Sequence, residues 1–141
     1  MFTTSITLDA IHSLSKNTIS QHLGIEFTEV GADYLVARMP VDTRTHQPFG
    51  ILHGGASVVL AETLGSIASY LCLKDPEKQR AVGLEINANH IRSVKEGFVY
   101  GKVTPIHIGR STQIWDIKIT NEENKLVCIS RLTVAIIDAK G

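Results

Sequence analysis

One acidic side chain interrupts a long uncharged stretch of the sequence and is the first candidate for chemistry. From Gly54 to Leu73 the only charged residue is Glu62, and the remainder is apolar or small. An unpaired buried charge costs several kcal/mol, so this carboxylate needs an explanation. Either it reaches a mouth or an interface, where it is solvated or paired, or it is a catalytic carboxylate held in a mostly apolar cleft.

Other groups of the same segment could act together with Glu62 on a carbonyl. Ser66, four residues later, shares its helix face and could hydrogen-bond the carboxylate or a water molecule. His53, Gly54 and Gly55 stand where a helix should begin, and helix N-termini present unpaired N–H groups and partial positive charge. The N–H of Gly54, with no side chain in the way, could polarise a carbonyl as an oxyanion hole does.

The stretch 54–73 predicts one long buried helix. It contains no proline, and at about 1.5 Å per residue it would be about 30 Å long. Apolar residues face all sides, which is typical of a buried helix. Glycine inside a helix costs about 1 kcal/mol relative to alanine, so we expect Gly65 to serve close packing. Glu62 and the serines and glycines favour a protein core over a membrane span.

The rest of the chain predicts an antiparallel sheet around that helix. Asp9 is expected to cap a short helix that ends at Ser15, and 16–22 to be a polar connector. Two strands, one buried helix and four further strands give an α+β fold. The last strand is apolar on both faces, which predicts self-association, since large exposed apolar patches are rare on monomers. Strands are expected at 24–30, 34–39, 80–92, 98–107, 112–120 and 125–137.

Length, charge, cysteine content and histidine spacing favour a single-domain cytoplasmic protein without a metal site. The 141 residues suit one domain, and the 14 basic and 14 acidic residues cancel, which gives no indication of a nucleic-acid partner. The two cysteines lie in apolar surroundings and are expected to be buried thiols, which fits the reducing cytoplasm. The N-terminal residues lack the basic and hydrophobic regions of a signal peptide. His12, His22 and His46 have no metal-ligand spacing, so no metal site is expected.

Taken together, these motifs resemble the hotdog-fold acyl-CoA thioesterases. The similarity is carried by the sequence from Gln47 to Ala56, QPFGILHGGA, and by LAETLGS from Leu60 to Ser66. GLEINANH at 83–90 and IHIGR at 106–110 continue it, so that it covers about 22–137 of a single domain, 1–141. It is strongest with the phenylacetate-pathway and menaquinone-pathway (1,4-dihydroxy-2-naphthoyl-CoA) branch. The resemblance implies a cytoplasmic homodimer or homotetramer that needs no cofactor, because coenzyme A is part of the substrate.

The resemblance also implies roles for individual residues. Glu62 is expected to act as nucleophile or as general base for water, and the Gly54 N–H as oxyanion donor. Gln47 would position or polarise the thioester. His53 matches a residue of the family's active-site motif, and Ser66 lies in the matching helix and is counted with the catalytic residues. Viewed without the resemblance, Gln47 is an ordinary loop residue and His53 a helix-start histidine bonded to backbone. The family usually draws these groups from different subunits.

A second set of residues is expected to contact coenzyme A. His90 and Arg92 on one strand, with His107, Arg110 and Ser111 around the next turn, are expected to form a polar cluster. Arginine binds phosphate bidentately, although such a cluster is also what a solvated strand end looks like. The full set that the resemblance implies is Val82, Gly83, His90, Ile91, Arg92, Ser93, His107, Ile108, Gly109, Arg110 and Ser111.

Several other functions compete with acyl-CoA hydrolysis as explanations of these residues. The runner-up enzyme hydrolyses acyl carrier protein thioesters, as the siderophore proofreading relatives do. A non-catalytic acyl-CoA sensor would need an output module, for which the residues before Gly24 are too few. The Asp-His pair of hotdog hydratases is not seen in the helix, and no Gly-x-Ser-x-Gly elbow indicates a serine hydrolase. Cys72 has no sequence-local basic partner that would activate it.

Overall fold

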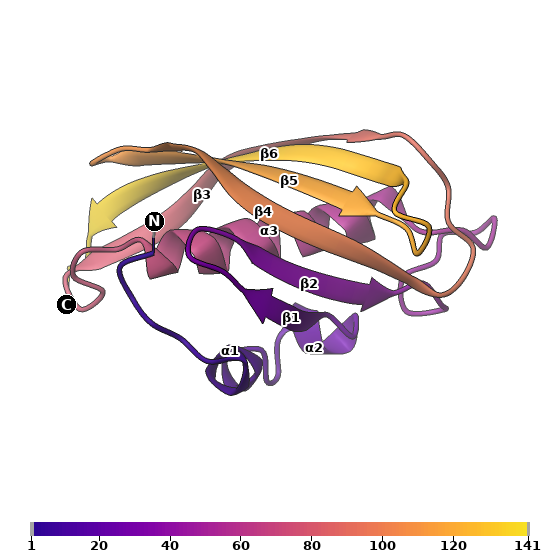
Figure 1. Ribbon diagram of the computed structural model, residues 1–141, viewed down its shortest axis with the longest axis horizontal. Helices are drawn as coiled ribbons and strands as arrows, with labels where there is room; N and C mark the ends of the chain where they lie inside the picture. The colour runs from indigo at the N-terminus through magenta and orange to yellow at the C-terminus, as the bar shows by residue number, and fades with distance from the viewer. Residues whose placement is uncertain (1, 141) are drawn as a thin grey trace.

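The structure is a computed structural model that describes residues 2–140. One long helix lies against a curved six-stranded sheet, and two short helices lie beside the first strand (Figure 1). This arrangement confirms the predicted α+β class. The elements are α1 (Leu8–Leu14), α2 (Ile19–His22), β1 (Glu26–Val30), β2 (Leu35–Pro40), α3 (Gly54–Leu71), β3 (Gln79–His90), β4 (Phe98–Ile108), β5 (Thr112–Thr120) and β6 (Leu126–Asp138).

The strand order places β3 at one edge of the sheet. The strands follow one another as β1-β2-β4-β5-β6-β3, and every neighbouring pair is antiparallel. Gly83 pairs with Val134 of β6 and His90 with Cys128, with a bulge between Gly83 and Glu85. Only β6 pairs with β3 among the described strands, so the other side of this twelve-residue strand offers its backbone groups for pairing.

Helix α3 is buried because small residues allow the sheet to approach it closely. Its inner residues Leu60 and Leu64 are fully buried, as is Trp115 on the facing side of β5. A Cβ atom at Gly65 would overlap the side chain of Leu132 on β6. This confirms the packing role expected for Gly65. Trp115, Ile117 and Ile119 share the inner face of their strand, as the alternation predicted.

Three predicted details of the helices are wrong. Thr7, not Asp9, caps α1, because its hydroxyl accepts the N–H of Ala10 at 3.1 Å. The expected connector at 16–22 contains the short helix α2. Helix α3 ends at Leu71, where the chain tightens and the N–H of Leu73 bonds to the carbonyl of Tyr70 at 3.1 Å. The first and third differences depend on local hydrogen bonds at the helix ends, which the hydrophobic pattern does not encode.

The cysteines are buried, as predicted, and neither forms a disulfide. Burial raises the pKa of both the Cys72 and the Cys128 thiol. A thiol that stays protonated at neutral pH is a poor nucleophile, which agrees with the low catalytic potential expected for Cys72. Among the helices of residues 2–140, none is both long and apolar enough to cross a membrane.

The close contact at Gly65 gives a test of the packing of α3. Gly65→Val should lower the free energy of unfolding by about 1–3 kcal/mol, because the new side chain overpacks against Leu132. Chemical denaturation measures the loss. Tyr70→Val places the same residue at an exposed position of the same helix and should cost clearly less. Equal losses in the two variants would mean that helix propensity, not contact with the sheet, sets the effect.

Candidate active site

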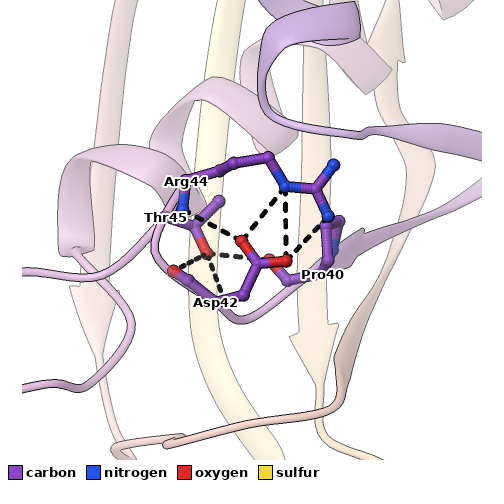
Figure 2. A network of polar contacts seen from close by, with 4 residues as sticks. All are labelled: Pro40, Asp42, Arg44 and Thr45. Carbon is purple, nitrogen blue, oxygen red and sulfur yellow. Dashed lines mark hydrogen bonds and ion pairs between the residues drawn. The ribbon is translucent and has the colours of Figure 1, made fainter.

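A compact polar network fixes the chain where β2 leads toward α3 (Figure 2). The buried hydroxyl of Thr45 donates to the carbonyl of Pro40 at 2.7 Å, and the N–H of Thr45 donates to the carbonyl of Asp42 at 2.9 Å. Arg44 pairs with the Asp42 carboxylate at 2.7 Å, and these hydrogen bonds lower the pKa of Asp42. Thr45 also accepts the N–H of His53 at 2.8 Å, so the end of β2 anchors the start of α3.

Gln47 lies on a tight loop between this network and the helix. Its N–H donates to the carbonyl of Ile51 at 2.9 Å, and the N–H of Gly50 donates back to the Gln47 carbonyl at 2.9 Å. Gly50 has φ +75°, which favours glycine. The side-chain carbonyl of Gln47 accepts the N–H of Phe49. The amide NH2 of Gln47 is therefore the part of its side chain that is left to donate to a ligand.

His53 caps α3, and the backbone N–H of the next residue, Gly54, has no acceptor in the described chain. Its Nδ1 atom accepts the N–H of Gly55 at 2.7 Å, and its carbonyl accepts the N–H groups of Ala56 at 3.0 Å and Ser57 at 3.3 Å. No group of residues 2–140 accepts the N–H of Gly54. The ring of His53 is therefore bonded to the backbone at the helix start, which is the alternative to a catalytic role for this residue. Gly54 presents a free donor at the positive end of the helix dipole.

Glu62 lies half-buried two turns further along α3 and faces the edge strand. A Cβ atom at Gly83 of β3 would lie 2.9 Å from Glu62 Oε2, so a larger residue there would shift the carboxylate end of this side chain. Within the described chain Glu62 makes no hydrogen bond and no ion pair. Ser66 is exposed and does not bond to it, so the expected Ser66–Glu62 hydrogen bond is not found.

One chain does not bring the oxyanion donor and the carboxylate together. Eight residues separate Gly54 from Glu62 on α3, a rise of about 12 Å. Gly54 lies against His90, whose Nε2 would be 2.8 Å from a Cβ atom on that glycine. Glu62 lies against Gly83, at the other half of the same strand. The attacked carbon and the oxygen of a single thioester group cannot span this separation.

The residues expected to contact coenzyme A also fall into two groups. His90, Ile91, Arg92 and Ser93 line a hollow of about 330 Å³ beside Gly54. Ile108, Gly109 and Arg110 line a second hollow of about 210 Å³, where α3 ends. Val82, Gly83 and Ser111 lie toward this second end, since Val82 pairs with Ala135 and Ala135 with Thr112.

The single polar cluster predicted from His90, Arg92, His107, Arg110 and Ser111 is therefore wrong for one chain. The reason is the register of the sheet. His90 is paired with Cys128, near the start of β6, whereas the turn after β4 lies beside the end of β6, where Ser111 accepts the N–H of Ile136 at 2.9 Å. The His107 ring lies over Gly109 in that turn.

Two buried polar residues in these hollows were missed by sequence reasoning. Ser57, only 1% exposed, lines the first hollow beside Gly54, and Gln113, only 2% exposed, lines the second. The alternation of the strand could have identified Gln113. Gln113 stands two residues before Trp115 and four before Ile117, so its side chain points to the same inner face as theirs. Across residues 2–140, no three His, Cys, Asp or Glu side chains are grouped to hold a metal ion.

Comparison with known proteins decides the family. The sequence model of the thioesterase superfamily matches residues 49–128. The 1,4-dihydroxy-2-naphthoyl-CoA hydrolase of Escherichia coli strain K12 is 53% identical over 132 residues, which are 94% of this chain and 96% of that protein. The chain belongs to the thioesterase superfamily. It is a thioester hydrolase, as the resemblance implied.

A second relative and a solved structure support the same family. The proofreading thioesterase EntH of Cronobacter turicensis is 53% identical to this thioesterase over 131 residues, 93% of this chain and 94% of that one. The crystal structure of a thioesterase from Haemophilus influenzae is 52% identical, with a TM-score of 0.93 over 97% of this chain and 94% of that one. The predicted hotdog fold is thereby confirmed.

A Staphylococcus aureus structure adds one detail about spacing. It is 41% identical to this thioesterase, with a TM-score of 0.83 over 86% of this chain and 99% of that one, and has alanine in place of a glutamate. In another structure of the same protein alanine replaces a glutamine that stands fifteen positions earlier.

The contact between Glu62 and Gly83 gives a test of the candidate site. Gly83→Ala should lower kcat/KM by about 10- to 100-fold, because the methyl group displaces the carboxylate from its position. Steady-state hydrolysis with thiol detection measures the effect, and thermal unfolding should be nearly unchanged. The shorter side chain of Glu62→Asp should remove the clash, so it should be less harmful in the Gly83→Ala background than in the wild type. Independent, multiplicative losses would contradict this steric account.

Proposed function

We propose that this thioesterase hydrolyses acyl-coenzyme A at active sites built from two copies of the chain. The observation that carries the proposal is the placement of Gly54 and Glu62 against opposite halves of the edge strand β3. Gly83 and His90, against which these groups lie, both belong to the edge strand at which a second copy could pair. A site with both groups therefore requires the Gly54 donor of one copy and the Glu62 carboxylate of the other.

Pairing of two β3 strands meets that requirement. A long edge strand with unpaired backbone groups is a ready template for another strand. If two β3 strands pair antiparallel about a two-fold axis between Ile86 and Asn87, Gly83 lies opposite the partner's His90. Because Glu62 lies against Gly83 and Gly54 against His90, each carboxylate then approaches the partner's Gly54. The closed pair has two such sites, and two pairs would form a homotetramer.

The groups of such a site suit attack on a thioester carbonyl. The Gly54 N–H and the dipole of α3 stabilise the negative charge that develops on the carbonyl oxygen, and the amide NH2 of Gln47 adds a donor. As a base, Glu62 takes a proton from the water molecule that attacks the carbonyl carbon, and the coenzyme A thiolate leaves and is protonated. As a nucleophile, Glu62 attacks the carbon itself, and water then hydrolyses the resulting anhydride. Gln47 and Glu62 have the same separation as the two residues replaced in the Staphylococcus aureus structures.

The same pairing would unite the two groups of coenzyme A residues. The turn at 107–111 of one copy lies one strand away from its Val82 end of β3, and that end is opposite the partner's Ile91 and Arg92. Arg92 and Arg110 would then approach the coenzyme A phosphates from two subunits, and arginine holds phosphate by paired hydrogen bonds. We therefore keep the predicted set of coenzyme A contacts, divided between two chains.

The acyl group is proposed to be aromatic, such as 1,4-dihydroxy-2-naphthoyl, or of medium length. The Escherichia coli relative, a 1,4-dihydroxy-2-naphthoyl-CoA hydrolase, supports the naphthoyl substrate. A cytoplasmic role in menaquinone biosynthesis is part of the same proposal and follows from the family resemblance. The second candidate is an acyl carrier protein thioester, the substrate expected for proofreading enzymes of the family, because the proofreading thioesterase EntH is equally identical to this chain. A non-catalytic acyl-CoA sensor is no longer a candidate, since the chain belongs to a family of thioester hydrolases.

The role of Glu62 can be tested by removing its charge. Glu62→Gln should fold and assemble normally and lower kcat by about 10²–10⁴-fold, because a neutral amide neither accepts the proton nor attacks the carbon. KM should change less than kcat. Hydrolysis of a panel of acyl-CoA thioesters, followed by release of free thiol, measures both constants. Glu96→Gln, which removes one charge from an exposed position, is the control and should remain active.

The panel also distinguishes the two substrate classes. If coenzyme A thioesters are the substrates, 1,4-dihydroxy-2-naphthoyl-CoA and benzoyl-CoA should give higher kcat/KM than the same acyl groups on an acyl carrier protein. The opposite order would support the proofreading alternative. A Glu62→Gln enzyme with near wild-type activity on all of them would contradict the assignment of Glu62.

A further inference from the structure

A small hollow at the C-terminal end of α3 has a polar residue at its buried side. We call it the C-terminal pocket. It is about 210 Å³ in volume and lies between the end of α3, the turn after β4 and the end of β6. Its lining residues are Cys72, Leu73, Lys74, Gln79, Ile108, Gly109, Arg110, Gln113 and Ile136. The apolar walls and the buried glutamine set it apart from a surface depression.

Gln113 turns hydrogen-bond donors toward this pocket. Its side chain is 2% exposed, and its Oε1 atom accepts the indole N–H of Trp115 at 3.3 Å. The same indole donates to the hydroxyl of Ser69 at 2.8 Å, so the tryptophan fixes which end of the amide faces the core. The NH2 group of Gln113 has no acceptor in residues 2–140. No buried side-chain nitrogen or oxygen of the described residues lacks a partner, so this NH2 group reaches the solvent in the pocket, where water or a ligand can accept its N–H groups.

The other polar side chains of the pocket are also donors. Gln79 uses its Oε1 atom to accept the N–H groups of Lys74 at 3.0 Å and Asp75 at 3.1 Å, which leaves its NH2 group. The side chains of Lys74 and Arg110 form no ion pair within the described chain. Asp75, the nearest carboxylate in the sequence, lies 3.7 Å from the ammonium group of Lys78. The pocket therefore combines two amide donors with two cations.

The end of a helix normally disfavours an anion, because its carbonyl groups carry partial negative charge. Here the carbonyls of Ser69, Tyr70 and Leu71 already have donors. The Ser69 carbonyl accepts the N–H of Cys72, and the Leu71 carbonyl accepts the N–H of Thr3 at 2.8 Å. The hydroxyl of Thr3 donates to the carbonyl of Leu73 at 2.8 Å. These bonds turn the carbonyl groups toward the N-terminal segment. The donors that line the pocket, rather than the helix carbonyls, therefore determine that the pocket favours an anion.

We propose that the C-terminal pocket binds a phosphate-sized oxyanion through Gln113, Gln79 and Arg110. Its volume suits one such group and is too small for a whole nucleotide. The group has two possible sources, a phosphate of coenzyme A and a free anion. If the source is coenzyme A, this pocket deepens the proposed function by defining where one phosphate is held.

Calorimetric titration with inorganic phosphate tests the pocket without any dependence on hydrolysis. Phosphate should bind the wild type, in contrast to chloride at equal ionic strength. Gln113→Glu keeps the acceptor for Trp115 and replaces the donor NH2 by an oxygen, so it should weaken phosphate binding by at least about tenfold. Arg110→Gln should have a similar effect. Arg131→Gln removes the same charge from an exposed position of β6 and should bind as the wild type does.

A competition experiment identifies the source of the anion. If saturating free coenzyme A prevents phosphate binding, the pocket receives a phosphate of coenzyme A, and if both bind together it holds a separate anion. Either result supports the site. If Gln113→Glu does not fold, Gln79→Glu tests the same loss of a donor. The proposal is overturned if the wild type binds phosphate no better than chloride, or if the folded variants bind it as well as the wild type.

Discussion

The burial of α3 against one curved sheet is the constraint on which the rest of the structure depends. Gly65 allows the helix to pack directly on Leu132, and Gly101 allows β4 to pack on Leu64. This close packing sets the depth at which Glu62 reaches the edge strand and the point at which His53 begins the helix. A helix displaced outward by one methyl group would move both the carboxylate and the Gly54 donor, so the core and the candidate site share one set of contacts.

Because β3 is an edge strand, the groups of α3 that lie against it can form a site together with a second chain. A strand in the middle of the sheet would have both of its sides paired, and the groups that α3 directs toward it would be enclosed. As an edge strand, β3 carries Gly83 beside the carboxylate and His90 beside the helix start, with one side open. Self-pairing would satisfy the open backbone groups and assemble the site in the same step, which links stability to activity.

Sequence patterns predicted most of the fold because burial follows periodicity. The range 112–120 was predicted without error, and the isolation of Glu62 in an uncharged helix identified it as a candidate. The split of the coenzyme A residues could not be predicted, since it depends on the register of β3 on β6. The cap formed by His53 and the orientation of the Gln113 amide depend on individual hydrogen bonds, which leave no periodic signal. The close approach of Gly83 to Glu62 requires the three-dimensional path of two distant segments.

Complementation between two inactive chains tests the shared site most directly. Gly54 is the first residue of α3 and follows a residue with extended backbone, so Gly54→Pro suits the backbone there and removes the N–H donor. The proline Cβ atom also presses on the His90 ring, so Gly54→Ala, which adds that Cβ atom and keeps the N–H, is the control. Loss of one oxyanion donor costs about 3 kcal/mol, and Glu62→Gln removes the carboxylate, so each folded variant alone should be nearly inactive. In an equimolar co-refolded mixture, half of randomly formed dimers are mixed and one of their two sites is intact, which predicts about one quarter of wild-type activity. A mixture that is shown to contain mixed dimers and remains as inactive as its parents would contradict a site shared between chains.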